Sequence, residues 1–573
     1  MYKKSPKNQF KLSSFDIPNS SSSSSSSSYY THKTPNQCQT QQCTLGLCYY
    51  NYFSLPKVDI AYSDNGNYEP LNIVCRFNQE AAASAATAAS SASAATKPYI
   101  SASIYSHLCD MKEQIEQFQE EWDNIKKFTN PYEFIHTNIT LSKTNISKLR
   151  PLSRSFYKMI EIATGVNLLD KYSDTVKPDV DYHSGIRTFH LAEGPGGFIE
   201  AISYLRGLEY EKIRKQSHTN PVQPTTSLQP TASIQILKRN TEFHDEYMKE
   251  IEHNKISKRI FEKMNQDSST GGVTIGAVTT GAMATNIKQY SHLSHEIYGN
   301  DRYYGMTLIN DDPICPGWKK TKTFLDNNPN VIIEIGEDKT GNLLSLANFQ
   351  RCASLYKNKM DIITADGGFD FSLDFNNQEN IATRLILAEV FFALAMQKKG
   401  GSFILKIFDI FHKSTVDILY LLSYYYSDVS VIKPYTSRIA NSEKYVICQG
   451  FKLDDSSILI EQICRVFMSC LHGTDAETGS VTGVPPQIAS LLERHHDLFY
   501  LNKIEEMNAI LSFQQIENIS STLSIITSYK NAEKIEQYKK QNIQKCINWC
   551  ERYNIPYFKQ IAGIPGGNIF LHR

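Results

Sequence analysis

The sequence predicts an α/β protein, built on a mostly parallel sheet of about seven strands with helices on both faces. Short apolar runs typical of buried strands alternate along the chain with segments of helical periodicity. Two of the passages between strand and helix also carry glycines or charged residues where the strand ends. Because open α/β sheets bind ligands at the carboxyl ends of their strands, we expect the functional site at that edge.

The central strand–helix–strand unit runs from Asp361 to Asp409. The apolar run DIITA ends just before Asp366, and the run FILKIF carries Lys406 in its middle. Between them, apolar residues recur every three or four positions, which predicts the buried stripe of an amphipathic helix: Ile381, Leu385, Ala388, Phe392 and Ala395. We expect Gly400 and Gly401 to end that helix.

Lys406 is unusual for an apolar strand. Burying an ammonium group costs several kcal/mol unless a partner compensates, so Lys406 is either paired, deprotonated or functional. The alternative is that its strand lies at the sheet edge and the side chain reaches water.

A second strand, turn and helix are predicted in GIRTFHLAEGPGGFIEAISYLR. The turn consists of Glu193, Gly194, Pro195, Gly196, Gly197 and Phe198. Glycines there let the backbone approach a ligand, and the amides of the following helix point at the same place. Such turns also occur in dinucleotide and phosphate sites, and some only pack a helix tightly. Glu193 either bonds a ligand or caps the helix, and we favour the ligand role.

Three regions are predicted along the 573 residues. Residues 1–100 hold Ser- and Ala-rich tracts, which predicts a mostly flexible region with one small hairpin at the Asn65-Gly66 turn signal. Residues 101–452 form the main domain, with a removable surface insertion at 211–297. Residues 453–573 are predicted to be a helical extension without a motif.

Composition limits the classes of partner and site. Lys plus Arg and Asp plus Glu number 59 each, so a nucleic acid would have to be held by a local basic patch. The 12 Cys residues contain no CxxC pair and the histidines lack ligand spacing, so we expect reduced thiols and no metal. No apolar run approaches the roughly 20 residues of a membrane span. We therefore expect a soluble intracellular protein of nucleus or cytoplasm that does not contact membranes.

The homopolymer runs and the Asn-, Lys- and Ile-rich usage are typical of an AT-rich genome, such as that of a large DNA virus or a protist. For a viral protein, the expected location would be the viral factory or the virion.

The order of several short motifs resembles the FtsJ-type (RrmJ-type) ribose 2′-O-methyltransferases, and among them the cap-specific mRNA enzymes. The motifs are Lys158, GPGGF (194–198), GMTL (305–308), ADGGF (365–369), LKIFD (405–409) and SRIANSEKYVICQGF (437–451). The likeness spans roughly residues 126–451, interrupted by the insertion. It implies a class I Rossmann-like methyltransferase fold, S-adenosylmethionine as donor and capped mRNA as substrate. Other capping or transcription proteins as partners are left open.

The resemblance also implies roles for single residues. A Lys-Asp-Lys-Glu tetrad falls on Lys158, Asp366, Lys406 and Glu443. Donor-binding positions fall on Glu193 to Phe198, on Asp366, and on Asn342-Leu343, where the capping enzymes have Asp-Ile to hold the adenine. The cap-facing positions map onto Lys126, Asn380, Arg438 and Ser442, and phosphate contacts are expected from Lys126, Arg150, Arg154 and Arg438.

The tetrad would orient the ribose 2′-hydroxyl, with Lys406 accepting its proton. Free lysine is a poor base at neutral pH because its pKa is about 10.4. Burial and the ammonium of Lys158 would lower the pKa of Lys406, whereas Asp366 and Glu443 would raise it, so the sequence leaves the net direction open.

Two other functions remain open at this stage. A ribosomal RNA 2′-O-methyltransferase would share the tetrad and donor loop, although the segment before Lys158 and the SRxANSE turn favour caps. A catalytically inactive RNA-binding or scaffold subunit could keep the fold. NAD binding is disfavoured, because GMTLIN offers no acid before Asp311 for the ribose hydroxyl.

Overall fold

The computed structural model describes 51–64, 66–78, 97–139, 144–176, 185–219, 301–309, 317–318, 321–368, 376–472, 487–528 and 531–558. All of these belong to one compact unit, Tyr49–Arg573. Residues 1–50 and most of the predicted insertion, 220–297, lie outside the described residues. No helix within the described ranges is long and apolar enough to cross a bilayer.

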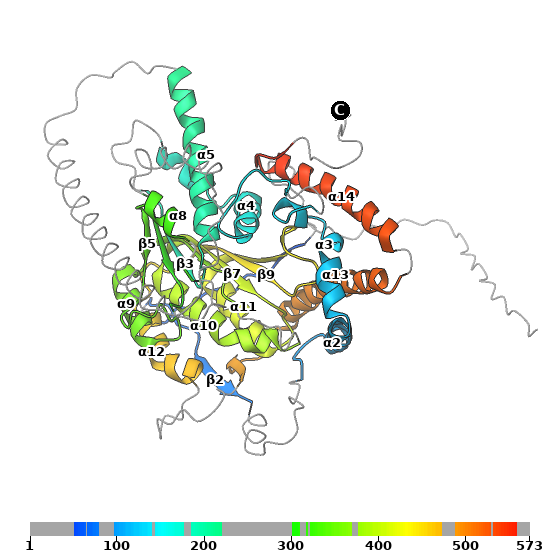
Figure 1. Cartoon of the computed structure of the whole chain (residues 1–573). Coiled ribbons are helices and arrows are strands. Elements are labelled where there is room, and N and C mark those ends of the chain that lie inside the picture. Colours follow the sequence, from blue (N-terminus) through cyan, green and yellow to red (C-terminus); the bar gives the residue numbers. More distant parts are fainter. Residues whose placement is uncertain are drawn as a thin grey trace, which may run out of the picture. The chain divides into compact units, whose positions relative to one another are not determined.

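The centre of the molecule is an eight-stranded sheet (Figure 1). Its order is β1 (Tyr52–Ser54), β8 (Tyr426–Ile432), β9 (Lys444–Phe451), β7 (Gln397–Ile407), β6 (Met360–Ala365), β3 (Arg187–Leu191), β4 (Arg302–Met306) and β5 (Val331–Ile333). The pairs among β5, β4, β3, β6 and β7 are parallel, whereas β9 is antiparallel to both β7 and β8. The predicted α/β class is therefore confirmed, and all seven predicted strands are present.

Helices cover both faces of the sheet, as predicted. One face packs against α9 (Leu346–Tyr356), α10 (Gln378–Met396) and α11 (Lys413–Tyr425), with α12 (Ser457–His472) outside them. The other face packs against α4 (Ser155–Gly165) and α5 (Gly197–Thr219), and the short α8 (Lys322–Asn327) adds Leu325 to the same core. Figure 1 shows these two helical layers on opposite sides of the strands. Neighbouring strand residues Ile362 and Ile363 enter different cores because side chains alternate across a sheet.

The stripe predicted for α10 is only partly right. Ala388, Phe392 and Ala395 are buried, but Ile381 is 41% exposed. Because α10 is enclosed by strands on one side and by α9, α11 and α12 on the other, its burial does not follow a single stripe. The helix ends at Met396, and Gly400 and Gly401 lie within β7.

The N-terminal boundary also needs correction, because part of the region predicted as flexible is folded. A turn forms at Ser63–Asn67, flanked by a bridge between Tyr62 and Tyr68. A small hairpin therefore forms at the predicted turn signal, but the strands on either side of it pair elsewhere: β1 pairs with β8, and β2 (Ile73–Phe77) pairs with β10 (Ile488–Leu492). Both strands find partners from distant parts of the chain, which local patterns cannot reveal.

Two helical extensions pack against each other beside the β8–β9 loop. The helix predicted from Ile104 to Phe128 is two helices, α2 (Ala102–Glu116) and α3 (Gln119–Thr129), followed by the short η1 (Glu133–Ile135). They contact α13 (Leu498–Ile526) and α14 (Asn531–Arg552). The short η2 (Asp170–Val176) lies between α4 and β3 in the sequence.

Candidate active site

The four predicted tetrad residues come together at one edge of the sheet. Asp366 follows β6, Lys406 lies near the end of β7, Glu443 precedes β9, and Lys158 lies on α4. The parallel register of β6 and β7 and the antiparallel register of β7 and β9 bring these three strand ends side by side. All four side chains are mostly or fully buried.

The tetrad consists of two ion pairs. Lys158 Nζ lies 2.7 Å from Glu443 Oε2. Lys406 Nζ donates to the Asp366 carbonyl oxygen at 2.7 Å and lies 3.3 Å from Asp366 Oδ1. The structure therefore decides the alternatives for Lys406 in favour of a paired ammonium in a central strand.

Tyr445 connects the two pairs, and the sequence analysis missed it. Its hydroxyl donates to Asp366 Oδ1 at 2.8 Å and accepts from Lys158 Nζ at 3.3 Å. Tyr445 is fully buried on β9 directly opposite Lys406. The available signal was its position two residues after Glu443, which places both side chains on one face of the strand.

The electrostatics answer the question that the sequence left open. Burial lowers the pKa of Lys406, but Asp366, Glu443 and Glu389 outweigh it and raise that pKa above the ordinary value. Burial is also the largest influence on Lys158 and lowers its pKa against the opposing charge of Glu443. Burial would raise the pKa of Glu443, yet Lys158 and Lys406 hold it well below its usual range. Lys406 is therefore held as an ammonium until the charge around it changes.

Glu389 of α10 is a second functional candidate that the sequence analysis missed. Its Oε1 accepts the Gly367 amide at 3.2 Å, directly behind the Asp366 turn. Burial raises the pKa of Glu389 to about 8, although Lys406 opposes this. A single Glu within the apolar run LILAEVFFALA was the signal that could have identified it.

The glycine-rich turn is shaped mainly by contacts within the chain. A Cβ on Gly194 would lie 2.9 Å from Gly317 Cα, and a Cβ on Gly197 would lie 2.2 Å from the hydroxyls of Ser153 and Ser155. Pro195, Gly196 and Phe198 complete a turn that packs the start of α5 tightly. Close packing, one of the alternatives for this motif, therefore accounts for these two glycines.

Glu193 keeps a feature that fits a cationic ligand. Its Oε1 accepts the Phe198 amide, but its buried Oε2 has no hydrogen-bond partner among the described residues. Burial, opposed by that amide, raises the pKa of Glu193 well above the usual value. An amine from a bound ligand would satisfy the second oxygen, so the ligand role of Glu193 stays a prediction that this geometry fits.

Asn342 and Leu343 are used by their own loop. Asn342 Oδ1 accepts the Leu344 amide at 3.0 Å, and Leu343 is buried in the core. The adenine contact of this pair stays a prediction, and these bonds give it no support.

A cavity of about 350 Å³ opens onto Lys406 and Glu443. Its walls include Trp122 and Phe408, together with three residues predicted to face the substrate: Lys126, Arg438 and Ser442. Asn380 and Arg154 are not among its lining residues. Asn380 donates to Asn377 Oδ1 at 2.9 Å and lies 3.2 Å from His412 Nε2. Arg154 precedes α4 and contributes to the lowered pKa of Glu443.

Two of the lining residues already have strong partners. Arg438 donates to both carboxylate oxygens of Glu133, at 2.6 and 3.0 Å. Burial would raise the pKa of Glu133, but these bonds lower it to about 2. Ser442 is buried and donates to Asp409 Oδ2 at 2.9 Å. Lys126 pairs with Asp123, whose side chain is 53% exposed. Such an exposed pair is weaker than the buried ones, so Lys126 is more readily available to a ligand.

Removing the Tyr445 hydroxyl should slow any reaction that uses Lys406 as a base. In Tyr445→Phe, Asp366 loses a donor and its charge acts more strongly on Lys406, whose pKa then rises. We expect kcat/KM to fall about 10- to 100-fold, the size of one hydrogen bond to a charged group. The rising limb of the kcat/KM profile, which reports deprotonation of Lys406, should move to higher pH. A loss of stability with an unmoved limb would show that Tyr445 only packs the strand.

The sequence also matches known proteins. Residues 258–451 match the model of the FtsJ-like methyltransferase family, a range that includes Asp366, Lys406 and Glu443 but not Lys158. The chain is 39% identical over 133 residues to cap-specific mRNA (nucleoside-2′-O-)-methyltransferase 2 of Drosophila melanogaster, covering 22% of this chain and 19% of the relative. It is 30% identical over 203 residues to cap-specific mRNA (nucleoside-2′-O-)-methyltransferase 1 of Trypanosoma brucei brucei, covering 35% of this chain and 52% of the relative.

A third relative is named as inactive. The inactive cap-specific mRNA (nucleoside-2′-O-)-methyltransferase 1B of Caenorhabditis briggsae is 32% identical over 136 residues, covering 23% of this chain and 16% of the relative. The chain thus spans between 16% and 52% of the length of these three proteins.

Proposed function

We propose that this chain, which carries an FtsJ-like methyltransferase domain, methylates the ribose 2′-hydroxyl of a cap-proximal nucleotide of mRNA. The observation that carries the proposal is the network Glu443–Lys158–Tyr445–Asp366–Lys406 at the ligand-binding edge of the sheet. It ends in an ammonium that lines a cavity next to Glu443. The curated relatives named as cap-specific enzymes support capped mRNA as the substrate class.

In this proposal, S-adenosylmethionine, when bound, would supply the methyl group: the carbon–sulfur bond of its sulfonium would break as the ribose oxygen bonds the methyl carbon, and the neutral thioether S-adenosylhomocysteine would leave. Glu193 and Asp366 are the carboxyl groups of the chain that would hold the donor. Lys406 Nζ orients the 2′-hydroxyl and takes up its proton. Asp366 is the strongest of the charges that raise the pKa of Lys406, so a cationic donor held by this carboxylate would lower that pKa and favour the basic form of Lys406.

The cavity walls fit a flat cationic ring better than a bare phosphate chain. Trp122 and Phe408 offer aromatic surface, and Lys126 offers a donor at the rim. The methylated guanine of a cap is recognised by shape and by hydrogen bonds at its edge. Two lining cations, Lys112 and Arg438, are bound by Asp409 and Glu133, which moderates the positive charge in the cavity.

The decisive experiment is a donor-dependent transfer assay on the full chain with capped and uncapped RNA of one sequence. Mapping of the modified nucleotide should place the methyl group on a ribose 2′-oxygen near the cap. Equal transfer to uncapped RNA would favour the ribosomal RNA alternative. Absence of both transfer and donor binding by calorimetry would favour the inactive scaffold, the reading to which the inactive relative lends weight.

Replacing Lys126 should weaken capped RNA selectively. In Lys126→Ala, we expect about a tenfold loss of affinity for capped RNA and little change for uncapped RNA, because the residue lines the cavity beside Trp122. The measurement is a pair of binding titrations in one buffer. Lys127→Ala is the matched control, because Lys127 lies on the same helix and is placed over the Phe128 ring.

Equal losses on both RNAs, with a salt slope lower by about one, would instead assign Lys126 to a phosphate contact. Asn380→Ala is predicted to be selective for capped RNA as well, whereas Arg154→Ala is predicted to weaken both. These two assignments rest on the resemblance and not on the cavity.

A further inference from the structure

A second cavity, of about 390 Å³, lies on the other side of the β8–β9 loop. It is enclosed by that loop, by α13 and α14, by the residues after α3, and by Asn51 at the start of β1. Asn441 and Gln515 line both this cavity and the 350 Å³ cavity at Lys406 and Glu443, which we call the tetrad cavity. Its volume is within the range of roughly 300–1,000 Å³ of small-molecule sites. We call it the rear cavity.

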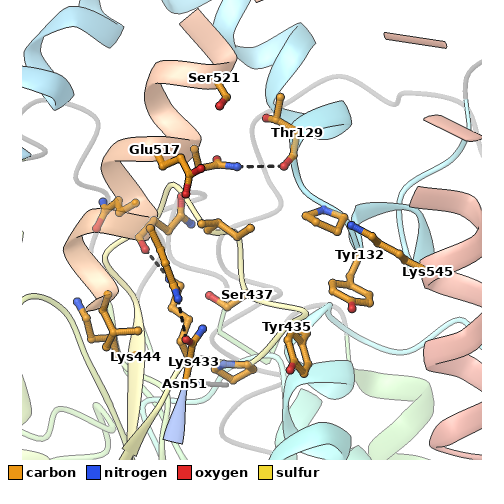
Figure 2. Close-up of a pocket in the computed structure, with 18 of the residues that line it drawn as sticks. Asn51, Thr129, Tyr132, Lys433, Tyr435, Ser437, Lys444, Glu517, Ser521 and Lys545 are labelled. Carbon is orange, nitrogen blue, oxygen red and sulfur yellow. Dashed lines mark hydrogen bonds between the residues drawn. The ribbon is translucent and has the colours of Figure 1, made fainter. Parts of the chain in front are cut away.

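The rear cavity has aromatic rings on one side and polar side chains of α13 on the other. Figure 2 shows Tyr132, Tyr435 and Lys545 facing Glu517 and Ser521 across the opening, with Ser437 between them. The rings of Tyr132 and Tyr435 lie 5.4 Å apart at 47°. A flat heterocycle fits such a lining, because it can lie against the rings while its edge meets polar groups.

Amide side chains supply those polar groups. Gln514 donates to Asn51 Oδ1 at 3.0 Å, and Asn518 donates to the Thr129 carbonyl oxygen at 3.1 Å. Asn518 Oδ1 is buried and has no hydrogen-bond partner among the described residues. An unpaired buried acceptor is unfavourable, so a ligand with an N–H donor, such as the exocyclic amine of a nucleobase, would satisfy it.

One exposed cation of the rear cavity can meet an anionic group. Lys433 and Lys444 are buried in its wall, where each holds backbone carbonyl groups of the β8–β9 loop. Lys545 is exposed at the rim on α14, and Glu517 is the carboxylate among the lining residues. Lys444 is already paired with Asp409 at 3.1 Å, and burial together with Lys444 lowers the pKa of Lys433 to about 7. Lys545 is therefore the lining cation that can meet a phosphate group next to the base of a ligand.

The rear cavity is one hydrogen bond away from the tetrad. Ser437, in its wall, donates to Glu443 Oε1 at 2.8 Å, while Glu443 Oε2 binds Lys158. A ligand that holds the β8–β9 loop there would also fix Glu443 and Arg438, which face the tetrad cavity.

We propose that the rear cavity binds one nucleotide unit, with the base against Tyr132 and Tyr435 and the phosphate towards Lys545. The preferred source is the RNA strand, a choice that rests on the proposed function. A free mononucleotide has the same chemistry. Binding would steady the β8–β9 loop and couple occupancy of this site to the geometry of Glu443.

The test is photocrosslinking of 4-thiouridine-containing RNA to the full chain, followed by mass spectrometry of the modified peptides. No donor or turnover is needed, so the result is independent of methyl transfer. We expect adducts on Tyr132, Tyr435 or Tyr538, at least fivefold weaker in Ser521→Trp, which fills the cavity, and in Lys545→Glu. Lys540→Glu, with the same charge change at another exposed position of α14, should crosslink like the wild type.

The same assay separates the two sources. Loss of adducts in the presence of millimolar GMP or AMP would point to a free mononucleotide, and adducts that resist competition but grow with RNA length would point to the strand. Adducts confined to the tetrad cavity, or adducts that neither variant reduces, would overturn the proposal. Lys545→Glu is a surface change, so the test stands even if Ser521→Trp does not fold.

Discussion

Lys406→Ala should reduce methyl transfer by about 10²–10⁴-fold, the usual contribution of a positioned general base. Lys406 is the ammonium that both lines the tetrad cavity and binds Asp366. Its loss removes the proton acceptor and leaves the Asp366 carboxylate without its cation. Donor affinity should change little, because Glu193 and the glycine-rich turn are untouched. The measurements are single-turnover transfer and donor calorimetry.

Lys399→Ala is the matched control for this variant. Lys399 lies on the same strand, β7, but is exposed and pairs with Asp454 at 2.6 Å, away from the cavity. Transfer by Lys406→Ala at the rate of this control would remove Lys406 from the mechanism. A loss of donor binding equal to the loss of transfer would assign Lys406 to the donor site.

The rate of methyl transfer should rise with pH. The base must be unprotonated, and the carboxylates around Lys406 raise its pKa above the ordinary value. The kcat/KM of the free chain should therefore keep rising through the alkaline range, whereas kcat, which reports the loaded complex, should level off at lower pH. A rate that is flat with pH in both parameters would contradict proton uptake by a lysine.

The strands and the functional edge of the sheet could be predicted from local patterns, whereas the complete tetrad was implied only by the resemblance to the FtsJ-type enzymes. Short apolar runs ended by Asp366 or interrupted by Lys406 specify both the element and its functional end. By contrast, Tyr445 was missed because its role depends on the register that sets it opposite Lys406. The partners of β1 and β2 were missed for the same reason, since strand pairing across more than 300 residues leaves no local signal.

The glycine-rich turn shows the opposite limitation. Its sequence predicted a ligand cradle, which stays a prediction, whereas a Cβ on Gly194 or Gly197 would meet Gly317 or the serines at the start of α4. A glycine pattern reports that a backbone approaches something closely, without saying whether that is a ligand or another segment. The rear cavity could not be predicted either, because five separate segments build it.

Lys158→Met should destabilise the fold by about 3–5 kcal/mol, the usual cost of removing one partner from a buried ion pair. Glu443 would remain mostly buried without the cation 2.7 Å from it, keeping only the hydrogen bond from Ser437. The free energy of unfolding at pH 7, from denaturant titration, is the measurement. The double variant Lys158→Met/Glu443→Gln, which removes both charges, should recover more than half of the loss.

The pH dependence of the free energy of unfolding tests the same ion pair. In the wild type, Lys158 and Lys406 hold the pKa of Glu443 below its unfolded value of about 4.3, so its stabilisation is present above that pH and lost as pH falls. Without Lys158, the charges that still oppose burial are those of Lys406 and Arg154, so the pKa of Glu443 rises. We expect it to pass its unfolded value, so that the carboxylate becomes a penalty that grows as pH rises above about 4.3. The gap between Lys158→Met and wild type should therefore widen from pH 5 to pH 7, while the gap for the double variant stays nearly constant. An equal gap at both pH values for Lys158→Met would mean that lost packing, and not the uncompensated carboxylate, causes the destabilisation.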